Sequence, residues 1–441
     1  LELELLVITV PLTGHCGYPL FTDHMFLSEV STKTGRVQVC CNSPESNYQW
    51  FRTGDAGLFW RKGVHYIMGR MIFHHPLPVR PKGWSGSQVR PYKMMEAFRA
   101  IGYEVEPVVG YGSERRKAIN DIKRAAKQGK RYDFVYSESS TMPTLLTEPH
   151  HVPTYPALDF NFFSWARARS IPIGLFYRDV HWRYSYYRDS LVWFKKAISL
   201  PLYYYDLANY RSLVDHLFLP SIGMSSALPI KWNRGMSALP PGVSALPAVQ
   251  ANPRQPSNEL ELLYVGGIKP PLYDLSPLFE TVRKVGGVRL TLCCRQPEWE
   301  SVGSFYRAMR TGQVRTVHVQ GAELRTLYLS ADIFVLLRNP HEYIDFAMPV
   351  KVFESLGYGV PILTLDGTEA ARFIREEGIG WVVGSVDEAC GVLQYLRDHR
   401  EEVDAMKERL SGIRLRHTWE ERARHVARTL TGQSQGGGEP S

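Results

Sequence analysis

Short apolar runs alternate with longer amphipathic segments along most of this chain, and this alternation limits its fold most strongly. An apolar run of about four to eight residues suits a buried strand, and the segments between the runs are long enough for helices. Strands separated by helices pair in parallel, which predicts an α/β fold. We expect strands at 64–68, 104–109, 132–136, 173–176 and 216–219 in a first series, and at 261–267, 289–293, 314–319, 333–337, 360–365 and 380–383 in a second.

The two series fit the length of the chain, because 441 residues are too many for one hydrophobic core. We predict two doubly wound, Rossmann-like domains, over 63–225 and 258–431, with a cleft where the carboxyl ends of their strands face each other. The Pro-rich stretch 226–257 repeats Ser-Ala-Leu-Pro and is expected to connect them. Residues 1–62 alternate short β-like runs with polar turns, which predicts a β-rich appendage, and the tail 432–441 is expected to be disordered.

One segment of the second series, Met348 to Pro361, indicates a binding site. It predicts a turn at Pro349, a short helix that carries Lys351 and Glu354, and then Gly359 before the next strand. Residues three apart share a helical face, and the first N–H groups of a helix are unpaired and attract anions. A cation and a carboxylate at such a helix start suit phosphate and hydroxyl groups, and so a nucleotide diphosphate joined to a sugar.

The motifs of the second series occur in an order that resembles a known family. Tyr-Val-Gly-Gly at 264–267 is followed by Gly321, then by Pro-x-Lys-x-x-Glu at 349–354 with Gly-x-Pro after it, and finally by Thr-Trp-Glu-Glu-Arg-Ala at 418–423. The ordered set looks like that of glycosyltransferases of the GT-B fold, particularly family 4 and its relatives. The resemblance covers about 258–430 well and covers 64–225 only as an architecture.

This resemblance assigns ribose binding to Glu354 and places Lys351 beside phosphate or sugar, although a helix-start carboxylate and a solvated lysine are the structural alternatives. Many relatives have a second acidic residue eight positions before that glutamate, where this chain has Phe346. Backbone amides around Ala347 and Met348 are left to contact the donor sugar. Recognition of the sugar is therefore expected to differ from that of the family.

Glycines and cations at strand ends are the candidates for the diphosphate. Gly266 and Gly267 end a strand where the backbone can approach phosphate closely, or they form only a tight turn. Lys269 follows them, but Pro270 replaces any nearby second cation. Arg338 follows the strand 333–337 and can supply the missing charge, unless it pairs with Glu342 or Asp345.

Two loops of the first series are expected to face the cleft. Gly86 and Ser87 lie between the first strand and its helix, where a glycine lets the backbone contact acceptor or donor phosphate. Asp179 and His181 follow the strand 173–176, and they can orient an acceptor hydroxyl and move its proton. A helix cap by Asp179 with a packed His181 is the alternative. An inverting enzyme needs such a base, whereas a retaining one can use the leaving phosphate.

Charge suggests anionic partners, since the net charge is +8 and the pI is about 9.0. Basic residues stud one predicted helix, which either rests on anionic lipid or is simply solvated. These residues are Arg115, Arg116, Lys117, Lys123, Arg124, Lys127, Lys130 and Arg131. Aromatic residues between Trp182 and Phe194 are interpreted as core or as sugar-stacking surfaces. Nucleic-acid binding is not expected, because the basic residues gather on one helix without interleaved exposed aromatics.

We therefore expect a glycosyltransferase that moves a sugar from a UDP-, GDP- or dTDP-linked donor to a glycan or lipid-linked acceptor, with a retaining mechanism favoured. By resemblance, the pathway is bacterial cell-envelope polysaccharide biosynthesis. No cofactor and no metal are expected, because no Asp-x-Asp motif is seen. The acidic start Leu1–Glu4 and the absence of a long apolar run predict a cytoplasmic protein, with peripheral contact at the inner face of the membrane left open. A sugar-nucleotide 2-epimerase of the same fold and a non-catalytic sugar-binding protein are the alternatives.

Overall fold

The computed structural model describes 69–81, 86–244, 259–307, 309 and 311–432, together with three short strands near the N-terminus. These are β1 (Val30–Ser31), β2 (Gln38–Cys40) and β3 (Gln49–Phe51), which form an antiparallel sheet in that order. They fall within the region predicted as a β-rich appendage and belong to a separate compact unit, 1–66. The tail predicted to be disordered lies, beyond Gly432, outside the described residues.

The first half of the larger unit contains a parallel sheet in the order β5-β4-β6-β7-β8-β9. Its strands are β4 (Gly69–His75), β5 (Tyr103–Val109), β6 (Phe134–Glu138), β7 (Ile173–Phe176), β8 (His216–Leu219) and β9 (Gly235–Ala238). Consecutive residues of β4 point to opposite faces, so Ile72 joins one core and Met71 and Phe73 join another. Apolar runs without alternation, such as Phe134 to Tyr136, therefore reflect burial on both faces.

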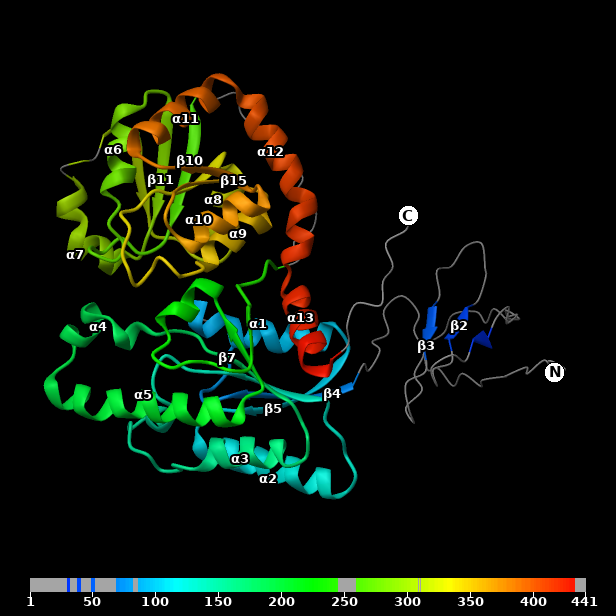
Figure 1. Cartoon of the computed structure of the whole chain (residues 1–441). Coiled ribbons are helices and arrows are strands. Elements are labelled where there is room, and N and C mark those ends of the chain that lie inside the picture. Colours follow the sequence, from blue (N-terminus) through cyan, green and yellow to red (C-terminus); the bar gives the residue numbers. More distant parts are fainter. Residues whose placement is uncertain are drawn as a thin grey trace, which may run out of the picture. The chain divides into compact units, whose positions relative to one another are not determined.

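Helices cover both faces of this sheet (Figure 1). The face of Ile72 is covered by α2 (Gly112–Lys127), α3 (Leu158–Arg167) and α5 (Trp193–Leu213). The other face is covered by α1 (Gly86–Ala100) and by α13 (Trp419–Thr431), the last helix of the chain. Shorter connecting elements are η1 (Thr144–Leu146), η2 (His181–Arg183), α4 (Ser185–Ser190) and η3 (Ile222–Ala227).

The second half contains another parallel sheet, in the order β12-β11-β10-β13-β14-β15. Its strands are β10 (Leu260–Val265), β11 (Val288–Cys293), β12 (Val314–Val317), β13 (Ile333–Leu336), β14 (Ile362–Leu365) and β15 (Gly380–Val383). The helices between and after them are α6 (Ser276–Lys284), α7 (Gln296–Arg307), α8 (Ala322–Ser330), α9 (Val350–Tyr358), α10 (Glu369–Glu377), α11 (Val386–Asp398), α12 (Arg400–Ile413) and η4 (Arg414–His417). The strand order reverses between β10 and β13, as in doubly wound folds that bind nucleotides.

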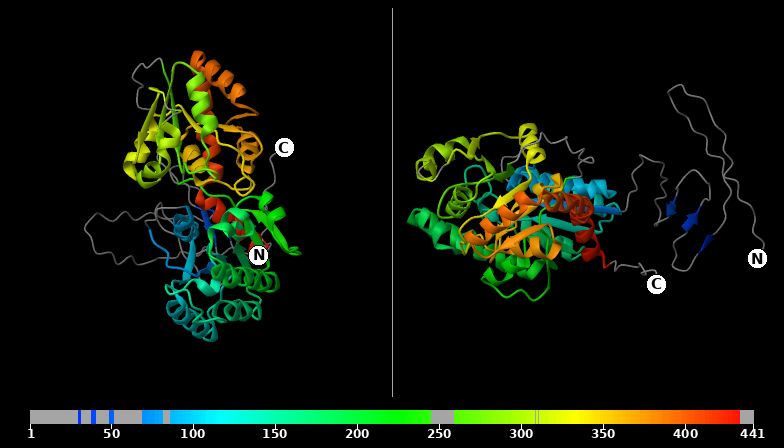
Figure 2. Two further views of the ribbon diagram at one scale, coloured as in Figure 1. Left: turned by 90° about the vertical axis from the view of Figure 1, so that its left-hand side faces the viewer. Right: turned by 90° about the horizontal axis from the view of Figure 1, so that it is seen from above.

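Three expectations about the elements need correction. The first strand of the N-terminal sheet begins at Gly69, and the predicted strand 64–68 lies, up to Met68, outside the described residues. Strand β9 lies inside the predicted connector, because its sequence Gly-Met-Ser-Ala has no apolar run that would identify it. Helix α13, grouped with the C-terminal domain by sequence order, packs instead on the N-terminal sheet, where Figure 2 shows it in red.

The chain crosses between the two domains twice, and the crossings are hydrogen-bonded to each other. Val243, on the way out, pairs in parallel with Thr418, on the way back. The Val243 N–H donates to the His417 carbonyl oxygen at 2.7 Å, and the Trp419 N–H donates to the Val243 carbonyl oxygen at 3.2 Å. The two domains are thus joined by a paired segment. Across the described ranges of this unit, no helix combines the length and apolarity that spanning a membrane requires.

Candidate functional site

The reversal of strand order between β10 and β13 brings two predicted segments to one edge of the C-terminal sheet. Gly266 follows β10 directly, and Arg338 lies two residues after the end of β13. Crossover helices leave this point in opposite directions, so the backbone opens a crevice at the carboxyl ends of the strands. Helix α9 begins beyond the same edge, after the loop that follows Arg338.

Helix α9 has the boundaries that its sequence predicts. Pro349 precedes its first residue without a side-chain cap, and Gly359 ends it in the left-handed conformation with φ of 70°. Lys351 and Glu354 form an ion pair, with 2.6 Å between Nζ and Oε2. The hydroxyl of buried Tyr328 also donates to Glu354 Oε2, at 3.2 Å. The carboxylate is therefore held in place from two sides while one third of its side chain stays exposed.

Arg338 differs from Lys351 because no ion pair engages its guanidinium in the part of the chain that the structure describes. Its side chain is only 8% exposed, and its guanidinium carbon lies 5.9 Å from the centre of the Tyr273 ring. Asp345, one of the two partners considered for it, instead accepts a hydrogen bond from the His341 backbone N–H. A buried cation that lacks a carboxylate is available for an anionic ligand.

Packing around Gly267 explains one of the two glycines that follow β10. A Cβ atom on Gly267 would lie 2.8 Å from the ring of Tyr273, so this position needs glycine for side-chain packing. The Gly267 carbonyl oxygen accepts a hydrogen bond from the Tyr264 hydroxyl. Lys269, just beyond, is exposed. Contact of Gly266, Gly267 and Lys269 with phosphate stays a prediction.

The loop between β13 and α9 carries Phe346 toward the N-terminal domain. Its ring lies 6.1 Å from that of Tyr184 and 6.0 Å from that of Tyr343. Its carbonyl oxygen accepts a hydrogen bond from the Ser221 hydroxyl at 2.6 Å. The position that is acidic in many relatives thus serves an aromatic contact between the domains. Met348, two residues later, packs its side chain against the C-terminal core.

Asp179 is also tied to this loop. Its Oδ2 accepts a hydrogen bond from the Tyr343 hydroxyl at 2.8 Å, and its Oδ1 accepts one from the His181 backbone N–H at 2.9 Å. The His181 ring meets the Tyr187 ring edge-on at 4.4 Å, and its Nε2 lies 3.4 Å from the Tyr203 hydroxyl. The cap and packing alternative therefore describes the geometry of this pair. Both side chains remain partly exposed, so an acceptor can still reach them. Their part in acceptor binding stays a prediction.

The sequence analysis missed a buried charge cluster where the strand order of the N-terminal sheet reverses, between β4 and β6. Glu138 is fully buried at the end of β6, and it pairs with Arg178 at 3.0 Å and with Arg90 at 3.3 Å. The Arg90 guanidinium stacks on the Phe176 ring, 3.5 Å from its centre. Burial lowers the pKa of Arg178. The available signals were Arg178 directly after the apolar run 173–177 and Glu138 two residues after the end of the run 134–136, whereas no local pattern marks Arg90.

Known proteins resemble the chain in sequence profile and in fold. Residues 276–428 match the profile of a family described as glycosyl transferase-like. Curated protein sequences give no match. The Anabaena protein HepE, solved in complex with UDP-glucose, is similar over 83% of this chain and 100% of its own, at 10% identity and a TM-score of 0.53. The lipopolysaccharide outer core galactosyltransferase WaaB is similar over 82% and 99%, at 14% identity and a TM-score of 0.51. A glycosyltransferase from Rickettsia africae is similar over 83% and 100%, at 11% identity and a TM-score of 0.54.

These similarities span both parallel sheets and decide the architecture. The chain has the GT-B fold. The fold expected from the ordered motifs is thereby confirmed, and its C-terminal half contains a glycosyl transferase-like domain. Membership of family 4 in particular stays a prediction.

Two further expectations concern the N-terminal domain of this GT-B fold. Gly86 and Ser87 were predicted to lie in the loop before a helix that begins near Arg90, whereas α1 begins at Gly86 and includes both residues. Contact of these residues with phosphate stays a prediction. Arg115, counted among the exposed cations of α2, is buried and binds both carboxylate oxygens of Asp159, at 2.8 and 3.0 Å. The basic face of α2 is therefore smaller than predicted, and its apolar residues Ile119 and Ile122 are buried in the core.

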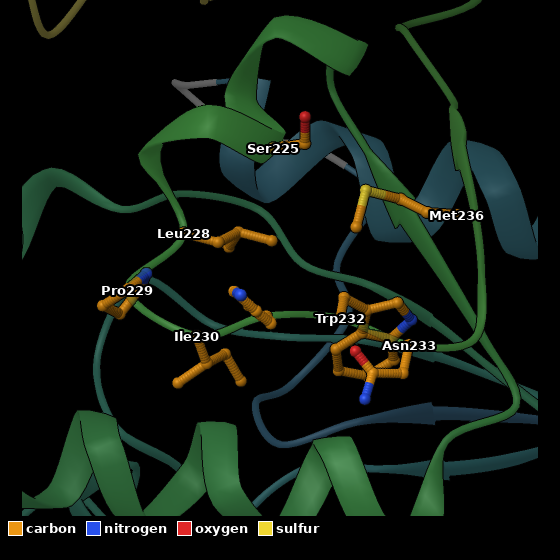
Figure 3. A pocket seen from close by; sticks show the side chains of 8 residues that line it. Ser225, Leu228, Pro229, Ile230, Trp232, Asn233 and Met236 are labelled. Carbon is orange, nitrogen blue, oxygen red and sulfur yellow. The ribbon is translucent and has the colours of Figure 1, made fainter.

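A hollow of about 420 Å³ lies beside β9 of the GT-B N-terminal domain (Figure 3). Leu228, Ile230, Trp232 and Met236 supply its apolar lining. All lining residues come from the segment 225–236, and none of them was predicted for the donor or acceptor site. The indole N–H of Trp232 is already used, because it donates to the Gly235 carbonyl oxygen at 3.2 Å.

Proposed function

We propose that this protein is a glycosyltransferase that moves a sugar from a nucleotide diphosphate donor to a hydroxyl acceptor. The observation that carries the proposal is the position of Arg338, a buried cation without an ion pair among the described residues, just beyond the carboxyl end of β13. The Lys351–Glu354 pair lies on α9, the helix that follows the same loop. The glycosyl transferase-like profile over 276–428 supports the proposal. The UDP-glucose complex of HepE, which shares the fold, favours a UDP-sugar over GDP- and dTDP-sugars.

The chemistry of each side chain suggests its part in donor binding. Lys351 and Tyr328 hold Oε2 of Glu354, and the carboxylate still has lone pairs that can accept hydrogen bonds. In the proposed complex it accepts them from the ribose hydroxyls. Arg338 binds the diphosphate through its planar fork of N–H donors, with Lys269 and Lys351 adding positive charge. Fixed positive charge that faces a leaving diphosphate stabilises it as the glycosidic bond breaks. The reaction then needs no metal ion.

The acceptor side is proposed to lie at Asp179 and His181, which orient the attacking hydroxyl. The acceptor is a glycan or a lipid-linked saccharide of the cell envelope, and the protein is cytoplasmic. We favour retention of configuration, in which the leaving phosphate takes the proton of the acceptor. Analysis of the anomeric configuration of the product tests this point, and an inverted product would assign the base to Asp179 or His181 instead.

Donor binding is tested by thermal unfolding with UDP-, GDP- and dTDP-sugars, since a ligand that binds the folded state raises the midpoint. Arg338→Ala and Glu354→Gln are expected to weaken donor binding by about 10- to 100-fold, because each removes a charge-assisted hydrogen bond. Arg338→Lys keeps the charge but loses the fork, and is expected to fall between Arg338→Ala and the wild type. Arg289→Ala, which removes an exposed cation near the opposite end of the same sheet, is the control.

The outcomes separate the alternatives. Transfer to a hydroxyl acceptor supports the proposal. Conversion of the donor sugar without an acceptor indicates a 2-epimerase, and donor binding without any turnover indicates a sugar-binding protein. Unchanged donor affinity in Arg338→Ala and Glu354→Gln would overturn the assignment of the site.

A further inference from the structure

The outward face of α5 is apolar over four turns. Trp193 is 79% exposed, Ile198 54% and Tyr204 49%. Trp193 and Tyr204 are eleven residues apart, about three helical turns, and so point in nearly the same direction. Ile198 lies further round the same outward half of the helix, away from the buried Tyr203 and Tyr210. The other members of this surface are Val192, Phe194 and Tyr205, each between 40% and 52% exposed. We call these six residues the α5 surface; it lies on the outside of the N-terminal domain (Figure 1).

The inward face of α5 explains why its apolar residues are outside. Tyr203, Asp206 and Tyr210 are buried, and each of them has a polar atom that is hydrogen-bonded in the core. Asp206 accepts a hydrogen bond from the Thr144 N–H at 2.7 Å, and the Tyr210 hydroxyl lies 2.9 Å from that of Thr144. These bonds fix the rotation of the helix. A soluble surface helix normally has the reverse distribution, so the exposed apolar face calls for a partner.

Positive charge borders the α5 surface. Arg188 and Lys195 are exposed, and Lys196 is one third exposed. Between 185 and 205 the sequence has one acidic residue, Asp189, whose carboxylate lies 3.9 Å from the Lys196 Nζ. The surface therefore combines tryptophan, tyrosine and aliphatic side chains with a net positive border.

We propose that the α5 surface docks on an anionic lipid bilayer, with the helix lying in the plane of the interface. Tryptophan and tyrosine prefer the boundary between headgroups and acyl chains, because their rings are apolar and their N–H or O–H groups stay hydrated. Lysine and arginine beside them attract anionic headgroups. The exposure of Trp193 and Phe194 contradicts their interpretation as core residues, and sugar stacking by them stays a prediction.

A second copy of the chain fits this surface less well. In a two-fold symmetric dimer the same surface meets itself, so Arg188, Lys195 and Lys196 of one copy would face their counterparts. Repulsion between these like charges opposes such an interface. Helix α2, the basic helix considered for lipid contact, presents no exposed large apolar side chain among the residues described, because its apolar residues face the core.

The test is sedimentation with vesicles, with no nucleotide sugar present, so that its result does not depend on the proposed function. The wild-type protein is expected to bind vesicles of phosphatidylcholine mixed with phosphatidylglycerol, to bind pure phosphatidylcholine weakly, and to bind less as salt increases. Trp193→Ser/Ile198→Ser is expected to reduce binding roughly tenfold or more, because both apolar anchors are lost. Lys195→Gln is expected to reduce binding only to the anionic vesicles.

Phe305→Ser and Tyr395→Ser are the matched controls, since they remove apolar side chains of similar exposure from α7 and α11. They are expected to bind like the wild type, and thermal unfolding checks that every variant is folded. The proposal is overturned if the wild-type protein stays in solution with anionic vesicles. It is also overturned if the Trp193→Ser/Ile198→Ser variant binds these vesicles as well as the control variants do. If the wild type dimerises but does not bind vesicles, and the double variant no longer dimerises, the surface is assigned to a second copy of the chain.

Discussion

Asp206 is a carboxyl group inside the N-terminal domain with only one of its oxygens hydrogen-bonded. Oδ2 accepts from the Thr144 N–H, whereas Oδ1 is buried without a hydrogen-bond partner. Burial raises the pKa of Asp206 to about 7 from its ordinary value of 3.8. The folded protein therefore keeps the proton of Asp206 at pH values where the unfolded chain has lost it.

This difference makes stability depend on pH in a defined direction. Protonated Asp206 leaves the free energy of unfolding at its full value below about pH 4. That free energy falls by roughly 4 kcal/mol in total as the pH rises to about 7. Asp206→Asn keeps the acceptor for Thr144 and carries no titrating group. The free energy of unfolding of this variant, from urea denaturation at several pH values, is expected to exceed that of the wild type increasingly up to about pH 7 and then by a constant amount. Two parallel curves would contradict this explanation.

At the residue scale, the sequence predicted that Lys351 and Glu354 lie together because their pattern is local. Lys351 and Glu354 lie three apart on one helix, so their pairing follows from spacing alone. The hydrogen bond between Tyr343 and Asp179 joins residues far apart in sequence, and no local pattern indicates it. The buried Arg90–Glu138–Arg178 cluster is also assembled from three separate elements.

At the scale of elements, α9 begins and ends through the backbone conformations of Pro349 and Gly359, without side-chain caps. Gly359 ends the helix with φ of 70°, and a Cβ atom there would meet no neighbour within 4 Å. The need for glycine is therefore conformational and not steric. The position of this end fixes where β14 begins, three residues later.

Gly359→Ala is expected to destabilise the protein by about 1 kcal/mol, because alanine is strained in the left-handed region. Gly391 offers a matched control. It is exposed within α11, and a Cβ atom there also meets nothing within 4 Å. Gly391→Ala is expected to stabilise by about 0.5–1 kcal/mol, since helix interiors favour alanine. Urea denaturation measures both, and shifts of the same sign would refute the distinction.

Element boundaries were predictable where apolar runs are clean, and not elsewhere. β7 and β8 occupy the predicted residues, because each is a run of four residues with no charged side chain. The start of β4 was missed because Arg70, His74 and His75 interrupt its apolar pattern. His75 is nonetheless buried, and burial lowers its pKa to about 3, so it is neutral in the sheet.

At the scale of the whole molecule, the last helix completes the core of the first domain. Trp419, Val426 and Leu430 of α13 pack with residues of α1, β4 and β6. The N-terminal sheet therefore depends on a segment that follows the whole C-terminal sheet in the sequence. The sequence placed this helix correctly along the chain but could not show its partner, because an amphipathic face does not specify which sheet it covers.

Leu430→Ala is expected to destabilise the protein by about 2–5 kcal/mol, because it leaves a cavity in the N-terminal core. Arg428→Ala, on the exposed side of the same helix, is expected to change the free energy of unfolding by less than about 0.5 kcal/mol. Urea denaturation of the full chain compares the two. Equal effects would show that α13 does not stabilise the N-terminal domain.

The contact between the domains is testable at the same scale. Tyr343→Phe removes the donor and Asp179→Ala removes the charged acceptor of a partly buried hydrogen bond. A double-mutant cycle on the free energy of unfolding is expected to give a coupling of about 1–3 kcal/mol. Additivity within about 0.5 kcal/mol would mean that this bond does not form in solution.

The paired crossing at Val243 and Thr418 sets the freedom of the two domains. Two hydrogen-bonded chain segments resist some relative motions of the domains more than others. Bending both about a common line preserves the bond from the Val243 N–H to the His417 carbonyl oxygen, whereas twisting one past the other would shear it. Bending about this line is therefore the domain motion that we expect to cost least, and it changes the separation of Asp179 from Arg338.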